Sequence, residues 1–367
     1  MKICYLANAR SIHTQRWAKH FSGRGHEVTV ISYSFGEIEG VRTICLSPAV
    51  HVSRLKIVQL LTKVRGLVQE IRPDILHAHY ATSYGLAGAL ASRRPLIVTA
   101  WGSDVLIQPE ESWIYRQMVR FVLSRADLIT SMAQHMTRHL VEKGYAGAEK
   151  IITLPFGVDT EVFNLNQRTR LHGEDPSFVV STRRLDPDYD VDIFIQAIPK
   201  VLSSYRHVRF IIVGDGSLRT QLEKLAGHLG VRDYVEFWGQ IPHQEMPKLL
   251  GQADVFVTTS PSDGNNISLN EAMACGVFPI ASDIPANQTW IEHRRNGLIF
   301  SCRDVDQLAS AIIEALGRPE WRKVTMAMNW DIVSRQASWS QSMVEMEQHY
   351  VRLLQEKQKD AKEIRPD

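Results

Sequence analysis

The segment VFVTTSPSDGNNISLNEAMACGVFPIA, residues 255–281, has a pattern of strand, loop, helix and strand. Val255–Thr258 and Phe278–Ala281 are short apolar runs bounded by turn residues, as strands are. Ile267–Ala274 lies between them and follows a dense group of turn residues, which predicts that a helix begins there. Apolar strands that alternate with helices are typical of a parallel sheet whose two faces are covered by helices.

The same alternation extends to both sides of this segment. Further strands are predicted at Phe178–Ser181, Arg209–Val213, Val235–Trp238, Lys2–Ala7, Glu27–Ile31, Asp74–His77, Leu96–Thr99 and Leu128–Ser131. We therefore predict an α/β chain with two Rossmann-like, parallel-sheet domains that face each other across a cleft. Ligands of such sheets bind at the carboxyl ends of the strands.

A polar stretch between Pro155 and Pro176 marks the predicted boundary between the two domains. Few apolar residues follow the last predicted helix, which predicts a tail that frays. The expected parts are an N-terminal domain, a C-terminal domain, a helix that packs back on the first domain and a frayed tail, at residues 1–165, 166–333, 334–356 and 357–367.

The composition is that of an ordinary globular protein. Of 367 residues, 42 are Lys or Arg and 40 are Asp or Glu, and the net charge of +2 disfavours a generally basic nucleic-acid-binding protein. No apolar run has the length of a transmembrane helix or of a signal peptide. The cysteines Cys4, Cys45, Cys275 and Cys302 are too scattered for a disulfide framework or a zinc site. These features predict a cytoplasmic protein with free thiols.

Positive charge is concentrated in the first half of the chain. Residues 1–165 carry 19 Lys+Arg and 13 Asp+Glu, whereas the remainder carries 23 and 27. Within residues 54–70, the cations Lys56, Lys63 and Arg65 are spaced among aliphatic residues, which is the pattern of a basic amphipathic helix. Two interpretations are open: a core helix with a solvated basic face, or a helix that contacts an anionic membrane surface or a phosphate-bearing acceptor.

A Gly-Asp-Gly run at residues 214–216 follows a predicted strand and resembles the start of a dinucleotide-binding fingerprint. Arg219 stands where that fingerprint needs its third glycine, which disfavours a nicotinamide site. We interpret the two glycines as a tight turn between a strand and a helix.

The loop and helix of residues 260–276 hold the candidate site. The first backbone N–H groups of a helix suit a diphosphate, because that end of the helix carries positive dipole. Asp263 in the loop and Glu271 in the helix are placed to bracket a ligand that lies across the helix start, and a carboxylate accepts paired hydrogen bonds from vicinal hydroxyls. In the alternative interpretation, Asp263 caps the helix and Glu271 is a solvated helix residue.

These residues resemble the carboxylate motif of retaining glycosyltransferases of family 4, which have the two-domain GT-B fold. The motif reads Asp263, seven residues, Glu271 and then Ala-Met-Ala-Cys-Gly. Further matching segments follow one another along nearly the whole chain, at residues 77–80, 101–104, 156–159, 213–219, 237–239 and 296–298. The resemblance implies a GT-B fold whose first domain binds the acceptor and whose second domain binds the nucleotide sugar.

The resemblance also implies roles for single residues. His79 would lie beside the reacting face of the sugar, Asp263 would stabilise that sugar, and Arg184 would bind the diphosphate. Donor-binding roles are implied for Glu271 at the ribose, for Gly264, Asn265 and Asn266 at the sugar, and for Gly239 and Ile241 at the nucleobase. The implied acceptor-side residues are His77, Tyr80, Trp101 and Asp104.

The chain departs from the family at the diphosphate. Tyr189 stands five positions after Arg184, where the family carries a lysine, so one positive charge is missing from the leaving-group site. Protein groups must neutralise a departing diphosphate when no metal does so. We expect a second arginine to compensate, with Arg183, Arg10 and Arg16 as candidates and Arg10, the closest to the first strand, as the favoured one.

The resemblance implies a retaining, metal-independent glycosyltransferase without a cofactor. It would move a hexose from a nucleoside diphosphate sugar to a hydroxyl of a glycan, a lipid-linked or a small-molecule acceptor, and form an α-glycosidic bond. Peripheral contact with an anionic membrane is an expected partner interaction, and nucleic acid is not. The alternatives are a catalytically silent protein that binds sugar nucleotides or glycans, and another GT-B enzyme such as a sugar-nucleotide epimerase.

Overall fold

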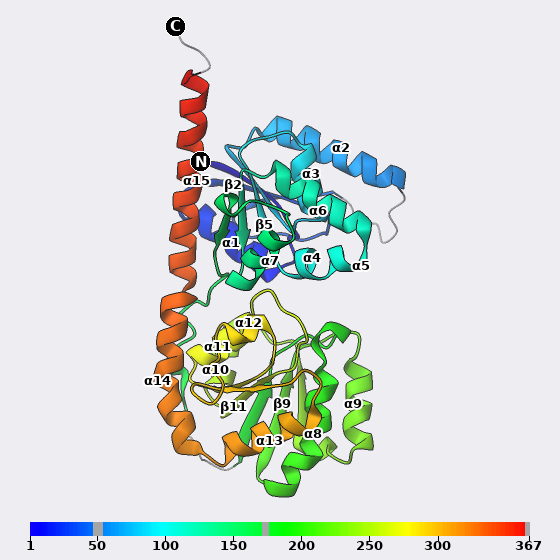
Figure 1. Cartoon of the computed structure of the whole chain (residues 1–367), viewed down its shortest axis with the longest axis vertical. Coiled ribbons are helices and arrows are strands. Elements are labelled where there is room, and N and C mark those ends of the chain that lie inside the picture. Colours follow the sequence, from blue (N-terminus) through cyan, green and yellow to red (C-terminus); the bar gives the residue numbers. More distant parts are fainter. Residues whose placement is uncertain (47–53, 171–175, 364–367) are drawn as a thin grey trace. The chain divides into compact units, whose positions relative to one another are not determined.

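The computed structural model describes residues 1–46, 54–170 and 176–363. It divides into two compact units, one of Met1–Leu154 with Met343–Asp367 and one of Pro155–Ser342 (Figure 1). Each unit is built on one parallel sheet, so the predicted α/β class and the two Rossmann-like domains are confirmed. The change of unit falls at Pro155, at the start of the polar stretch rather than at residue 165.

The sheet of the first unit has the strand order β3-β2-β1-β4-β5-β6-β7, and its pairs are parallel. The strands are β1 (Lys2–Leu6), β2 (Glu27–Ser32), β3 (Arg42–Cys45), β4 (Ile75–His79), β5 (Leu96–Ala100), β6 (Leu128–Ser131) and β7 (Ile151–Thr153). β4 and β5 are buried along their whole length, because helices cover both faces of the sheet. The strand order reverses between β1 and β4, which brings the loops after these two strands together at the carboxyl edge.

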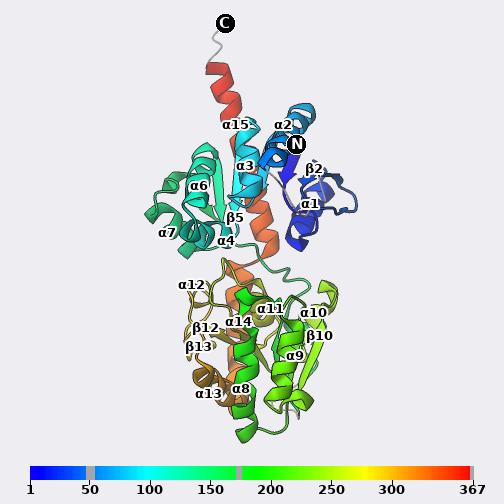
Figure 2. The same ribbon diagram turned by 90° about the vertical axis from the view of Figure 1, so that its right-hand side faces the viewer.

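The helices of the first unit include a layer in which α3 lies between α2 and α6 (Figure 2). Their bounds are α1 (Ile12–Gly23), α2 (Arg54–Ile71), α3 (Ser83–Leu90), α4 (Ser103–Leu106), α5 (Gln108–Glu111), α6 (Trp113–Arg125) and α7 (Gln134–Glu142). No helix within the described residues is both long enough and apolar enough to cross a membrane.

The C-terminal region contains two helices, α14 (Pro319–Gln336) and α15 (Trp339–Glu363). α15 packs on the first unit, where the buried Tyr350 hydroxyl lies 3.1 Å from that of Tyr5. The prediction of a frayed tail from residue 357 is wrong for residues 357–363, because the helix continues to Glu363. The Lys357 ammonium donates to the Arg94 carbonyl at 2.8 Å, which ties this last part of the helix to the unit. The rest of that tail, residues 364–367, lies outside the described residues.

The sheet of the second unit has the strand order β10-β9-β8-β11-β12-β13 and is again parallel. The strands are β8 (Ser177–Ser181), β9 (Val208–Val213), β10 (Val235–Gly239), β11 (Val255–Thr258), β12 (Phe278–Ser282) and β13 (Leu298–Phe300). α8 (Val191–Ser204) and α9 (Arg219–His228) lie side by side on this unit (Figure 2). Its other α-helices are α14 and, before it, α10 (Met246–Leu250), α11 (Ile267–Ala274), α12 (Pro285–Gln288) and α13 (Val305–Leu316).

The Gly-Asp-Gly run forms the tight turn that we predict after β9. Gly214 has a φ of +136°, and a Cβ at this position would lie 2.2 Å from the carbonyl oxygen of Arg183. Only glycine lets the two loops approach so closely. The turn therefore supports the loop that follows β8.

Candidate functional site

The candidate site of the second unit is built on the loops that follow β8 and β11. These strands are neighbours in the sheet at the point where the strand order reverses. Parallel strands present their carboxyl ends at one edge, so the two loops meet there. The loop after β8 carries Arg183 and Arg184, and the loop after β11 carries Asp263.

Arg183 holds the Asp263 carboxylate. Its Nη2 lies 2.5 Å from Asp263 Oδ2, and its Nη1 donates to Asn266 Oδ1 at 3.0 Å. The guanidinium also stands over the Tyr189 ring, 4.7 Å from the ring centre, in cation–π geometry. The Arg183 and Asp263 side chains are only 10% and 17% exposed, so the pair is shielded from water. A cation therefore lies beside Tyr189, although it comes from position 183.

Arg184 points to a different partner. Its Nε and Nη2 bind Asp186 Oδ2 at 2.9 and 2.7 Å, and its side chain is 71% exposed. The hydrogen bond to Asp186 raises the pKa of the Arg184 guanidinium. The Asp186 carboxylate also accepts from the backbone N–H of Ser217, the foremost cause of its lowered pKa. Arg184 is thus held at the surface of the loop with N–H groups open to an anionic ligand.

The start of α11 is capped by Asn266. Its Oδ1 accepts from the Leu269 amide at 3.2 Å, and its Nδ2 donates to Thr258 and Asn287. The alternative in which Asp263 caps this helix is therefore wrong. Asp263 Oδ1 instead accepts from the Asn265 amide at 3.1 Å and so shapes the turn before the helix. Gly264 is buried in the same turn.

Glu271 is 6% exposed, so the alternative of a solvated helix residue is wrong as well. Its Oε1 lies 2.8 Å from Nε2 of His243, and the His243 ring lies 5.1 Å from that of Phe163. His243 is not among the residues that the sequence motifs single out. Glu271 and His243 are 28 positions apart in sequence, and no motif connects them.

The two residues expected at the nucleobase lie at the end of β10. Gly239 has a φ of +70°, and its carbonyl accepts from the Gly214 amide at 2.8 Å. Ile241 is half-buried against the apolar cluster that contains Phe163 and Leu269. Both residues belong to the segment that leads into His243, so the candidate nucleobase segment and the carboxylate of Glu271 are linked within one unit.

His79 lies at the carboxyl end of β4 in the first unit. It is 1% exposed and enclosed by aromatic rings, with centres 5.6 Å away for Tyr5 and 5.3 Å away for both Trp17 and Trp101. Neither ring nitrogen has a hydrogen-bond partner among the described residues. Burial lowers the pKa of the His79 imidazole to about 3, so it is neutral near pH 7.

His77 lies in the core of the first unit and not on the acceptor-side surface that the resemblance implies. It is 0% exposed; its Nδ1 lies 2.7 Å from the Tyr350 hydroxyl and its Nε2 lies 2.6 Å from the Thr99 hydroxyl. Both nitrogens are therefore engaged inside the core, because His77 lies two residues before the end of β4. Burial lowers its pKa well below the ordinary value.

Asp104 joins the loops after β4 and β5. It is fully buried and accepts hydrogen bonds from the backbone amides of Ala81, Trp101 and Gly102 at 2.6, 3.0 and 2.9 Å. Tyr80, with a φ of +75°, stacks on Trp101 with ring centres 5.7 Å apart. Asp104 therefore shapes this face only through the loops that it binds, whereas Tyr80 and Trp101 are partly exposed on it.

Arg10 is exposed in the loop after β1, where its amide donates to the Asn8 side chain at 3.0 Å. It belongs to the first unit, as does Arg16, whereas Arg184 belongs to the second. The compensating role of Arg10 and Arg16 at the diphosphate stays a prediction. Arg183 is the candidate arginine that lies beside Tyr189 within the second unit.

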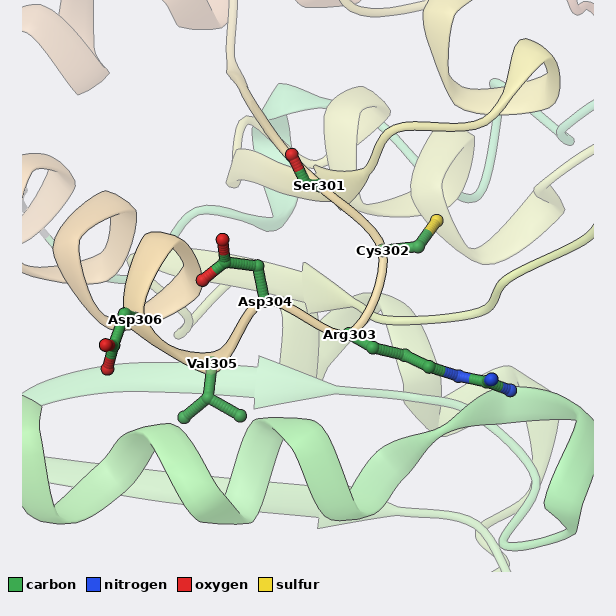
Figure 3. A pocket seen from close by; sticks show the side chains of 6 residues that line it. All are labelled: Ser301, Cys302, Arg303, Asp304, Val305 and Asp306. Atoms are coloured by element: carbon green, nitrogen blue, oxygen red, sulfur yellow. The ribbon is translucent and has the colours of Figure 1, made fainter.

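A surface pocket also lies beside the loop after β13, and it is a weaker candidate (Figure 3). In that view the Arg303 side chain points away from the carboxylates of Asp304 and Asp306. Each of these charged side chains already has a structural partner. Arg303 pairs with Asp190, Asp304 caps α13 and Asp306 pairs with Lys200. Within the parts of the chain that the structure describes, no cluster of three or more His, Cys, Asp or Glu could hold a metal ion.

Two family models match the chain. Residues 163–327 match Glycosyl transferases group 1, and residues 2–133 match Glycosyl transferase 4-like. A GDP-mannose-dependent alpha-(1-6)-phosphatidylinositol monomannoside mannosyltransferase of Mycobacterium tuberculosis is 31% identical over 285 residues, 68% of this chain and 72% of that protein.

Solved structures share the fold. Anabaena Alr3699/HepE in complex with UDP and glucose superposes with a TM-score of 0.81 at 21% identity, over 96% of this chain and 100% of the other. A sucrose-phosphate synthase from Thermosynechococcus elongatus gives a TM-score of 0.82 at 19% identity, over 96% and 98%. These similarities confirm the fold that the sequence motifs imply.

Proposed function

The chain belongs to the glycosyl transferases group 1 family, and on this premise we propose that it is a retaining glycosyltransferase. It moves a hexose from a nucleoside diphosphate sugar to a hydroxyl group of an acceptor and forms an α-glycosidic bond. The observation that carries this proposal is the pair of carboxylates at α11, with Asp263 held by Arg183 and Glu271 held by His243. Oriented carboxylates suit the hydroxyls of a sugar and a ribose, and Arg184, on the neighbouring loop after β8, suits a diphosphate.

The proposed reaction proceeds on one face of the sugar. The bond between the anomeric carbon and the diphosphate oxygen breaks, the acceptor oxygen bonds to that carbon, and the acceptor proton passes to the leaving diphosphate. Asp263 stabilises the oxocarbenium-like sugar and does not attack it, because its carboxylate is paired with Arg183. Protein cations, with Arg184 foremost, neutralise the diphosphate, so that the proposal includes neither a metal nor a cofactor.

The direct test is a screen of nucleotide sugars, including GDP-mannose and UDP-glucose, by thermal shift and turnover. A donor at about a hundred times its Kd stabilises the folded chain by about 2.7 kcal/mol. Release of nucleoside diphosphate that depends on an added hydroxyl acceptor supports a transferase, whereas release without acceptor or loss of the sugar's configuration contradicts it. Tight donor binding without turnover points to the silent binding protein instead.

Glu271→Ala should weaken nucleoside diphosphate binding by about tenfold or more, because it removes the acceptor of two ribose hydroxyl hydrogen bonds. Calorimetry on the purified variant measures this loss. Glu245→Ala removes an exposed carboxylate from the neighbouring segment and should leave the affinity unchanged. Equal affinities for the wild type and Glu271→Ala would remove Glu271 from the donor site.

We also propose that the acceptor is lipid-linked and that α2 docks the first unit on an anionic membrane. α2 buries Val64 and Val68, while Lys56, Lys63 and Arg65 are exposed, as are Ile57 and Val58 at 41% and 60%. The mycobacterial relative, whose name includes a phosphatidylinositol monomannoside, supports a lipid acceptor. The proposed location is the cytoplasm, at the inner face of the membrane.

Flotation with vesicles tests this docking. The wild type should float with vesicles that contain phosphatidylglycerol at low salt and release at high salt, since each cation near such a surface contributes about 1 kcal/mol. Lys63→Ala/Arg65→Ala should weaken binding by about thirtyfold. Arg206→Ala/Lys224→Ala removes two exposed cations from the second unit and serves as the control. A wild type that stays unbound at low salt would favour a soluble acceptor.

A further inference from the structure

The contact between Glu271 and His243 connects two segments of the second unit. Glu271 lies on α11, whose residues from Leu269 to Ala274 are buried. His243 begins the short 3-10 turn of His243–Glu245, after the loop that follows β10. His243 Nε2 lies 2.8 Å from Glu271 Oε1, and the two side chains are 34% and 8% exposed. The histidine thus covers one oxygen of a carboxylate that water hardly reaches.

His243 is held in place by its own neighbours. Its ring lies against the ring of Phe163, which is 1% exposed, with the centres 5.1 Å apart. Ile241 and Met246, on either side of His243 in sequence, pack against the same apolar cluster. A ring that lies against Phe163 on an anchored segment can fix the carboxylate that it contacts, because the hydrogen bond then costs little further side-chain entropy.

The chemistry of the two groups determines the direction of the hydrogen bond between His243 and Glu271. An ionised carboxylate only accepts hydrogen bonds, so Nε2 of His243 is the donor. A carboxylate in an enclosed site needs such a donor, because an unpaired buried charge is strongly disfavoured. A carboxylate has about four lone-pair positions, so His243 leaves acceptor capacity on both oxygens of Glu271. Those remaining positions can meet a ligand that donates two adjacent hydroxyls.

We propose that His243 is a positioning residue that holds the Glu271 carboxylate in the orientation that recognises the vicinal hydroxyls of the donor ribose. The inference deepens the proposed function and rests on it. It assigns to His243 a share of the selectivity for ribonucleotides over deoxyribonucleotides, without direct contact with the ligand. A histidine that merely fastened the 3-10 turn to α11 would not affect that selectivity.

The test is a thermodynamic cycle that combines the loss of the His243 side chain with the loss of one ribose hydroxyl. Calorimetry measures the Kd of UDP and GDP, and of the 2′-deoxy and 3′-deoxy forms of whichever binds more tightly. The proteins are the wild type, His243→Phe, His243→Gln and the control His228→Phe, whose side chain is exposed at the end of α9. His243→Phe keeps a ring against Phe163 but has no donor, whereas His243→Gln keeps an N–H donor.

His243→Phe should weaken the ribonucleotide by about tenfold and each deoxynucleotide by about twofold or less. His243→Gln should recover most of the lost affinity, and His228→Phe should match the wild type. Equal losses for ribo- and deoxynucleotides, or full affinity in His243→Phe while the wild type binds, would overturn the role of His243 and leave the proposed function intact. A wild type that binds no nucleoside diphosphate, with ADP and CDP tested beside UDP and GDP, would overturn both.

Discussion

Arg184→Ala should lower turnover by about a hundredfold to a thousandfold, the range found when one group that stabilises developing negative charge is removed. Arg184 lies on the loop after β8, next to the loop that carries Asp263, and Asp186 holds its guanidinium at 2.7 and 2.9 Å. Its 71% exposed side chain keeps N–H groups available for a diphosphate. Arg183 cannot replace it, because its guanidinium is bound to Asp263 and Asn266.

A second variant separates the effect of the positive charge of Arg184 from that of its planar shape. Arg184→Lys keeps the positive charge but loses the planar, paired donors that match phosphate, so its turnover should fall between those of the wild type and the alanine variant. Arg318→Ala removes an exposed arginine that pairs with Glu314 and should leave turnover unchanged. Steady-state rates at saturating donor measure all four proteins. Full activity in Arg184→Ala would place the diphosphate elsewhere and show that the match of this loop to the family is wrong.

Most of the fold could be predicted from the local pattern of the sequence. The helix expected at Ile267–Ala274 and the strand expected at Val255–Thr258 have these bounds in the structure. Apolar runs and turn residues determine such elements locally, and the alternation of strands and helices determines the parallel sheets. The strand order was not predicted, and it is the strand order that places the loop after β8 beside the loop after β11.

The contacts of the site were harder to predict, because they depend on loop geometry. Strand alternation does not determine the direction of Arg183, because β8 ends at Ser181. The backbone then turns Arg183 towards Asp263 and the Tyr189 ring. The cation beside Tyr189 within the second unit is therefore Arg183, one of the candidate arginines, and it is bound to Asp263 and Asn266.

His79→Phe should lower turnover by about a hundredfold while leaving the fold at least as stable as that of the wild type. The two nitrogens of His79 are buried without a hydrogen-bond partner among the described residues, and an unsatisfied buried polar group costs about 1–3 kcal/mol. The surrounding rings of Tyr5, Trp17 and Trp101 suit a phenyl ring. A position that lowers stability in this way is typical of residues retained for function.

His77→Phe is the matched control, because it makes the same change two residues earlier on β4. His77 binds the hydroxyls of Tyr350 and Thr99 at 2.7 and 2.6 Å, so its loss leaves buried partners unsatisfied and should destabilise the fold by about 1–3 kcal/mol. Thermal unfolding and steady-state turnover of both variants separate the two effects. Loss of stability in His79→Phe with turnover retained would make His79 a structural residue like His77.

The pH dependence of stability gives an independent measure of the same residue. The pKa of His79 is about 3 in the folded chain and near 6.5 when it is unfolded, so below about pH 6.5 the unfolded chain binds the extra proton. Stability due to the neutral His79 is complete above that pH and falls by about 1.4 kcal/mol per pH unit between about pH 6.5 and pH 3, the pKa of His79 in the folded chain. His79→Phe should lose this part of the slope, whereas a variant with an unchanged slope would mean that the folded chain protonates His79 readily. If His79 lies beside the sugar as proposed, its imidazole is neutral at pH 7, and the wild-type pH–rate profile should show no ionisation from it between about pH 6 and 8.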